Sequence, residues 1–351
     1  MRSTFLGVII ACATFVVGVF TGLIYRYTQH EQCLAQTGSA AAILSPSQKS
    51  DPPVIEQYPE DGALDPFDIA FFIDDHPESD LAPLWKRLKI TADDTHFDST
   101  TICGQCKAST FQYDLDNDSK NEVVVQIKSH FGESYRYLVF TPSRYDDSKF
   151  LGHIDAWAKY PPSDPFVLVS NGQAWLVVQS TAGTGSGLGA WRDTVYQVSD
   201  RGVRPVASYL AKVNQNGEPR FPAKEFFGRP VSCEIKGGRV ILTVIYKVEY
   251  SGFPTSELSL FTKRQKAVLV SSLGKGESSL DVAHSEMSQD EFDSIYNIDS
   301  MDQEEFLKYN RAELRTIAAG NNEKKKKWLH QFLANCVDSV IKRELLGLLR
   351  H

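Results

Sequence analysis

Between residues 111 and 272 the sequence repeats one arrangement, in which short segments rich in β-branched and aromatic residues alternate with tight turn sequences. The turns Asn171-Gly172 and Gly237-Gly238 favour two-residue hairpins, because these residues accept positive φ. Strands joined by such short turns are antiparallel neighbours. The sequence therefore predicts a meander, a sandwich or part of a propeller. The predicted strands are residues 122–127, 135–140, 166–170, 173–180, 194–198, 203–209, 231–236, 239–250, 258–262 and 267–272.

Helical patterns lie on both sides of this β region. Residues 65–72 and 81–88 are predicted to form short helices before it. After it, Ser288-Gln289-Asp290-Glu291 resembles a capping box that opens a helix. Residues 302–319 and 323–349 have apolar side chains at helical spacing, and each is predicted as a helix. The expected fold class is α+β, mainly antiparallel β with C-terminal helices.

The N-terminal residues 5–25 contain no charged side chain and are rich in Val, Ile and Phe. As a helix this segment spans about 30 Å, the thickness of a bilayer's hydrocarbon core. The apolar core of a cleaved secretory signal is shorter, roughly 7–15 residues, so an uncleaved transmembrane anchor is favoured over a cleaved signal. Arg2 favours a cytoplasmic N-terminus, which places the remaining chain outside. Gly18 and Gly22 form a GxxxG pair suited to a homodimer of such helices.

The anchor sets the expected organisation of the chain. The segment after it is rich in small and polar residues, as flexible linkers are. The formal net charge of −7 argues against nucleic-acid binding. We expect a membrane protein that faces the outside, with the periplasmic side of a bacterial inner membrane favoured. The predicted parts are a cytoplasmic tail (1–4), the anchor (5–25), a linker (26–65), a β-rich extracytoplasmic domain (66–286) and a helical C-terminal region (287–351).

An acidic segment comes directly before the first Val-rich strand. Asp114, Asp116 and Asp118 alternate along it, and Glu122 follows. Carboxylates crowded on a tight turn repel one another unless a hard cation lies among them. This spacing of oxygen atoms predicts a Ca²⁺ site, with a solvated acidic turn as the alternative.

The flanking residues distinguish between kinds of calcium loop. An EF-hand loop requires a glycine where Ser119 stands and an acidic residue where Val125 stands, and its flanks are helices. Residues 112–127 instead resemble the Asp-x-Asp-x-Asp-Gly-x-x-Asp loop of FG-GAP or VCBS-type repeats, which leads into a Val-rich strand. The sequence contains one copy of this loop. The resemblance implies side-chain ligands from Asp114, Asp116, Asp118 and Glu122, and a carbonyl ligand from Lys120.

The sequence Cys103-Gly104-Gln105-Cys106 permits three interpretations. A local disulfide is favoured, because the predicted compartment is oxidising. A redox-active pair needs a βαβ context, which is missing here. A zinc site with His96 lacks a fourth ligand. The remaining candidates for pairing are Cys33, Cys233 and Cys336, and the sequence does not choose among them.

Residues 180–189 are rich in glycine, but neither a helix nor a lysine follows, as a phosphate-binding loop requires. We predict a rim loop in which Gly185, Gly187, Trp191 and Arg192 contact a ligand. The favoured function is a non-enzymatic one, in which a calcium-stabilised β domain binds a protein or glycan of the cell envelope. One alternative is a hydrolase with its site near residues 183–189. It would use Asp193 and His153 as its acidic and basic groups. The other alternative is a redox protein that uses Cys103 and Cys106.

Overall fold

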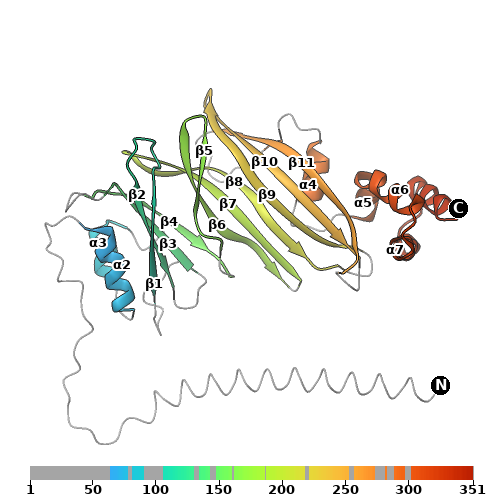
Figure 1. Ribbon diagram of the computed structural model, residues 1–351, viewed down its shortest axis with the longest axis horizontal. Coiled ribbons are helices and arrows are strands. Elements are labelled where there is room, and N and C mark those ends of the chain that lie inside the picture. Colours follow the sequence, from blue (N-terminus) through green and yellow to red (C-terminus); the bar gives the residue numbers. More distant parts are fainter. Residues whose placement is uncertain are drawn as a thin grey trace, which may run out of the picture. The chain divides into compact units, whose positions relative to one another are not determined.

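The computed structural model describes residues 64–77, 81–90, 106–129, 134–142, 148–159, 162–185, 187–217, 221–252, 257–272, 281–282, 288–296 and 302–350 (Figure 1). The chain divides into two units, residues 1–51 and 52–351, and every described residue belongs to the second. The predicted anchor at residues 5–25, with Gly18 and Gly22, lies outside the described residues. Within the described part of the chain, no helix has the length and apolar character needed to cross a bilayer.

Four strands form the first sheet, in the order β1-β2-β3-β4, and each pairs antiparallel with its neighbour in sequence. On one face, Val125 and Leu138 pack against helices α2 and α3. On the other, Val124 and Val139 pack against residues of the second sheet, including Leu176. Because both faces are covered, β2 and β3 are buried at most positions on both faces. The elements are α2 (Pro66–Asp75), α3 (Ala82–Arg87), β1 (Lys107–Tyr113), β2 (Glu122–Lys128), β3 (Ser134–Phe140) and β4 (Phe150–Trp157).

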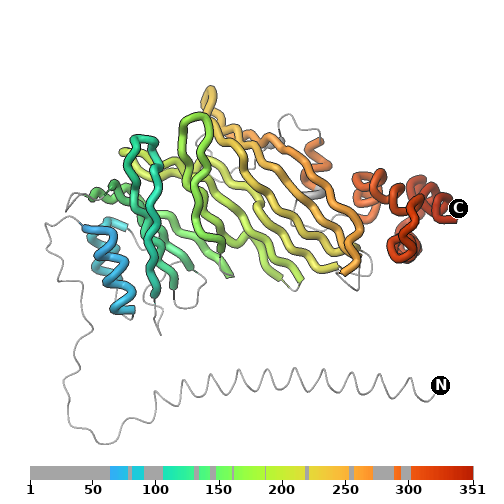
Figure 2. Tube along the Cα trace, in the orientation of Figure 1, coloured from blue at the N-terminus to red at the C-terminus, as the bar shows by residue number. Residues whose placement is uncertain are grey.

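Eight strands form the second sheet, again an uninterrupted antiparallel meander, in the order β12-β11-β10-β9-β8-β7-β6-β5 (Figure 2). The predicted hairpin turns are confirmed: Asn171 and Gly172 have φ values of 52° and 73°, and Gly237 and Gly238 have 59° and 73°. The strands are β5 (Phe166–Ser170), β6 (Gln173–Gly185), β7 (Leu188–Ser199), β8 (Gly202–Gln215), β9 (Ala223–Lys236), β10 (Arg239–Ser251), β11 (Ser259–Ser272) and β12 (Asp281–Val282).

The second sheet is strongly curled at its β5 end. Although β5 pairs only with β6 in the sheet, it also lies against β9. The Asn171 amide Nδ2 donates to Glu234 Oε2 at 3.4 Å, from the β5–β6 turn to β9. Register shifts in the β6–β7, β7–β8 and β9–β10 pairs mark bulges, which increase local twist. The curl brings two strands together that are far apart in the strand order.

Five C-terminal helices continue the core of the second sheet. Phe306 packs on Tyr250 of β10 with ring centroids 5.4 Å apart, and Leu329 belongs to the same buried cluster. Two lysines donate to backbone carbonyl oxygens and join the layers: Lys325 to Leu260 at 2.6 Å, and Lys263 to Tyr309 at 2.7 Å. The helices are α4 (Gln289–Tyr296), α5 (Gln303–Tyr309), α6 (Arg311–Ala319), α7 (Glu323–Asn335) and α8 (Val340–Leu348).

The antiparallel, β-rich fold with C-terminal helices is confirmed, but several predicted elements are wrong in extent. Residues 258–262 and 267–272 belong to the single strand β11, because its polar middle pairs with β10 without interruption. Residues 302–319 form two helices separated at Asn310. Residues 323–349 also form two, because Cys336 is extended and the Ser339 hydroxyl accepts a hydrogen bond from Lys342 N, capping a new helix.

Candidate functional site

The acidic loop, defined here as residues 114–121, joins β1 to β2 and is folded by its own carboxylates. Asp118 N donates to Asp116 Oδ1 at 3.1 Å, Ser119 N to Asp114 Oδ2 at 3.1 Å, and Lys120 N to Asp118 Oδ1 at 2.8 Å. Asn117 and Ser119 have φ values of 65° and 68°. Asparagine tolerates this left-handed region, whereas serine is strained there and glycine would not be.

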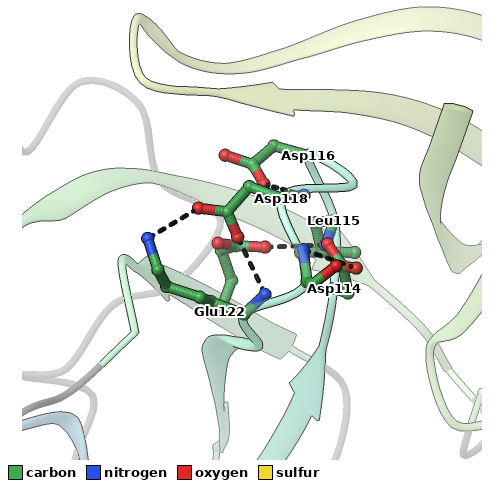
Figure 3. A network of polar contacts seen from close by, with 7 residues as sticks. Asp114, Leu115, Asp116, Asp118 and Glu122 are labelled. Carbon is green, nitrogen blue, oxygen red and sulfur yellow. Dashed lines mark hydrogen bonds and ion pairs between the residues drawn. The ribbon is translucent and has the colours of Figure 1, made fainter.

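Three carboxylates converge at this loop (Figure 3). Asp114, Asp116 and Glu122 each offer an oxygen, and these oxygens lie within 4.8 Å of one another. Glu122 is 2% exposed, and its Oε2 accepts a hydrogen bond from Leu115 N at 2.6 Å. Asp114 Oδ1 is buried and has no hydrogen-bond partner among the described residues. The three converging carboxylates thus gather negative charge around one point, and no cationic side chain of the described residues pairs with them.

Electrostatics at the loop distinguish Glu122 from Asp118. Burial raises the pKa of Glu122, and the nearby Asp116 and Asp118 carboxylates add to that rise, while the Leu115 N–H opposes it. Asp118 Oδ2 instead pairs with the Lys120 ammonium at 3.0 Å, and this contact lowers the pKa of Asp118. The structure therefore brings together three of the four predicted carboxylates, and Asp118 engages Lys120. The ligand roles of Asp118 and of the Lys120 carbonyl stay predictions.

The donor set fits a hard divalent cation. All three converging groups are carboxylates, and Ca²⁺ prefers oxygen ligands. Calcium takes about 6–8 oxygens, so further carbonyl or water ligands would complete the shell. The buried, unpartnered Asp114 Oδ1 has the free acceptor capacity that such a ligand needs.

A second polar site lies in the curl of the eight-stranded sheet. A cavity of about 500 Å³ is lined by residues of β5 to β9. Asp193 of β7 lines it and is 4% exposed. In the strand register, Asp193 stands beside Gln179 of β6 and Tyr209 of β8. Gln179 Nε2 donates to Asp193 Oδ1 at 2.9 Å, and the Tyr209 hydroxyl donates to Asp193 Oδ2 at 2.8 Å. We call this pocket the Asp193 cavity.

The protonation of this buried carboxyl follows from its surroundings. Burial raises the pKa of Asp193 to about 6, although the hydrogen bonds from Gln179 and Tyr209 favour its charged form. Burial and the adjacent carboxyl raise the pKa of Tyr209 far above its usual range, so the phenol remains a donor. Among the described residues, Asp193 has no ion-pair partner; Lys212 and Arg229 line the same cavity without forming one with it.

The predicted rim loop is a strand hairpin. β6 and β7 pair as far as Gly185 and Leu188, and Gly187 has a φ of 84° in the turn. None of the four predicted ligand-contact residues lines the Asp193 cavity, although Asp193 directly follows two of them, Trp191 and Arg192. A Cβ at Gly189 would lie 2.9 Å from the Trp191 ring, so glycine is required there for packing.

The acid–base pair of the hydrolase hypothesis is not brought together at the cavity. His153 of β4 does not line it. Its Nε2 lies 3.8 Å from Asp155 Oδ2, and Asp155 forms a two-point ion pair with the fully buried Arg136, at 2.6 and 2.9 Å. The Arg136 guanidinium lies 4.5 Å from the centre of the Trp85 ring. This arrangement joins β3, β4 and α3 and is structural.

The described cysteines are poor nucleophiles. Cys106, Cys233 and Cys336 have no disulfide partner within the described ranges, so of the pairings left open, that of Cys233 with Cys336 is not formed. Burial raises the pKa of Cys233 to about 12 and that of Cys336 to about 11, and it also raises the pKa of Cys106. Cys103 lies outside the described residues, so its disulfide or redox pairing with Cys106 stays a prediction.

Gln179 and Tyr209 were missed from sequence. The sequence signal for such residues is a polar side chain at a position where the side chains of a strand point inward. Gln179 is an example, because it lies on the same face of β6 as the buried Trp175 and Val177. Only the strand register shows that these positions adjoin Asp193.

No family model, curated protein or solved structure matches the chain.

Proposed function

We propose that this chain is a membrane-anchored protein of the cell envelope whose β domain, stabilised by calcium at the acidic loop, binds an envelope partner. The observation that carries the proposal is the convergence of Asp114, Asp116 and Glu122, with oxygens within 4.8 Å of one another and Asp114 Oδ1 without a partner. The anchor rests on the uncharged residues 5–25 and places the β domain outside the membrane.

Calcium acts here on stability. The loop joins β1 to β2, and β2 contributes Val124 and Val125 to the clusters on both faces of the first sheet. Holding the loop therefore holds the strand that both clusters share. A ligand that binds only the folded state adds about 2.7 kcal/mol at a concentration of 100 times its Kd.

The test is thermal unfolding of the full chain in detergent, with calcium, with magnesium and with a chelator. Calcium should raise Tm by several degrees in the wild type and leave Tm unchanged in Asp116→Asn. Asp200→Asn, in the exposed β7–β8 turn, is the matched control and should respond as the wild type does. Superimposable melting curves in excess calcium and in chelator would reject the calcium part of the proposal.

A second candidate, hydrolysis, is favoured by one observation. A carboxyl with a pKa of about 6 that lines a cavity has the properties of a general acid or base near neutral pH. Assays with chromogenic esters and glycosides should then show turnover that Asp193→Asn abolishes and Asp200→Asn retains. Absence of turnover in the wild type removes this candidate and leaves the binding role.

A further inference from the structure

The Asp193 carboxylate keeps free acceptor capacity in the wall of a half-open cavity. An ionised carboxylate has about four lone-pair positions, and the bonds from Gln179 and Tyr209 use one on each oxygen. The Gln179 amide is itself fixed, because its Oε1 accepts a hydrogen bond from Ser163 N at 3.0 Å. The carboxylate is therefore held rigidly at 4% exposure, with acceptor positions left for a donor that enters the cavity.

Charged residues of both signs line this cavity. Asp164 and Asp193 contribute negative charge, and Lys212 and Arg229 contribute positive charge. A cationic ligand would meet Lys212 and Arg229, and an anionic ligand would meet the two carboxylates. A hydroxyl group both donates and accepts hydrogen bonds, so a ligand with several hydroxyls satisfies both kinds of wall residue with one functional group.

Two phenylalanines lie on the strands that the curl brings together. Phe166 of β5 is 38% exposed and Phe227 of β9 is 39% exposed, and both line the cavity. The Lys212 ammonium lies 5.4 Å from the centre of the Phe227 ring. Large aromatic surfaces offer apolar contact area at low conformational cost, and the C–H faces of a sugar ring can pack on them. A volume of about 500 Å³ lies within the usual range of small-molecule sites.

We propose that the Asp193 cavity binds a neutral carbohydrate, one or two sugar residues of an envelope glycan. Asp193 accepts hydrogen bonds from sugar hydroxyls, Lys212 and Arg229 donate to others, and Phe166 and Phe227 pack on the ring. This inference rests on the proposed binding function and names its partner class. The acidic loop takes no part in the contact.

The test is isothermal titration calorimetry of the calcium-saturated full chain, in a detergent without a sugar headgroup. The probes are maltose, cellobiose and N,N′-diacetylchitobiose, with putrescine and citrate as charged comparisons. At least one disaccharide should bind, and Asp193→Asn should weaken that binding by about tenfold or more, as expected for loss of a hydrogen bond to a charged group. Binding by none of the disaccharides, or a preference for putrescine or citrate, would overturn the proposal.

Matched variants keep the test independent of folding. Phe227→Leu changes a half-exposed ring and should weaken disaccharide binding, whereas Phe71→Leu, on the exposed face of α2, should not. Asp200→Asn is the control for Asp193→Asn, and thermal melting confirms that each variant is folded. Disaccharide binding that survives Phe227→Leu and Asp193→Asn unchanged would place the sugar elsewhere. If a disaccharide binds but calcium does not raise Tm, only the calcium proposal is rejected. If calcium raises Tm but no disaccharide binds, only the carbohydrate proposal is rejected.

Discussion

The acidic loop and the Asp193 cavity each bury one carboxylate, Glu122 and Asp193, but they surround it by opposite means. At the loop, three carboxylates lie together, Glu122 is almost fully buried, and Asp114 Oδ1 has no partner in the described part of the chain. In the cavity, a single carboxylate takes a hydrogen bond on each oxygen from neighbouring strands. The difference is that the loop brings several carboxylates to one point without a cationic side chain paired to them, whereas in the cavity neutral donors on neighbouring strands hold the Asp193 carboxyl.

The largest expected effect is the pH dependence of Asp193. Its folded pKa, raised to about 6, exceeds the usual 3.8, so the folded state holds the proton more tightly. The stability that this contributes is fully present below about pH 4 and is lost as pH rises through 6, a change of about 3 kcal/mol. In urea unfolding, the free energy of unfolding of the wild type, measured relative to that of Asp193→Asn, should fall by about 2–3 kcal/mol between pH 4 and pH 7. A difference that does not vary with pH would show that folding does not raise the pKa of Asp193.

The next effect compares two carboxylates of the loop. Asp114→Asn should remove calcium stabilisation, about 2.7 kcal/mol at 100 times the Kd, because Asp114 belongs to the converging triad. Asp118→Asn should retain most of it, because the Asp118 carboxylate pairs with Lys120. The measurement is the calcium-induced change in Tm. Equal loss in both variants would mean that Asp118 turns toward the ion, as the FG-GAP or VCBS resemblance implies.

These two regions also show what sequence alone can reveal. The loop was predicted because its acidic residues are close in sequence, so their spacing alone brings them together. Asp193, Gln179 and Tyr209 lie on three strands, and their contact depends on a register that bulges shift, such as the one between Trp191 and Arg192. Hairpin turns were predictable for the same reason as the loop. The ends of β11 and the break after α7 could not be predicted from sequence. The length of β11 is set by its pairing with β10, and the break depends on the new helix cap at Ser339.

A smaller effect concerns the Tyr209 hydroxyl. Tyr209→Phe leaves Asp193 Oδ2 without its donor and should cost about 1–3 kcal/mol at pH 7. The cost should shrink at pH 4.5, where Asp193 is mostly protonated and no longer a buried anion. Urea unfolding at both pH values measures this. A cost independent of pH would assign Tyr209 a packing role alone.

The smallest effect separates backbone strain from charge in the loop. Ser119→Gly should stabilise the chain by up to about 1 kcal/mol, because glycine adopts a φ of 68° without strain. Ser232→Gly, inside β9, should instead destabilise it by about 0.5–1 kcal/mol, since glycine weakens a strand. Thermal unfolding with and without calcium measures both. Loss of stability in Ser119→Gly would show that the loop does not hold that backbone conformation.

The uninterrupted meander of the second sheet has a kinetic consequence. Each strand from β5 to β12 pairs with its neighbour in sequence, so the sheet can assemble one hairpin at a time from local contacts. The approach of β5 to β9 joins segments separated by three whole strands, and this loop closure carries an entropic cost that the hairpins do not. The wall of the Asp193 cavity that β5 and β9 build together is therefore expected to form after the hairpins of the sheet.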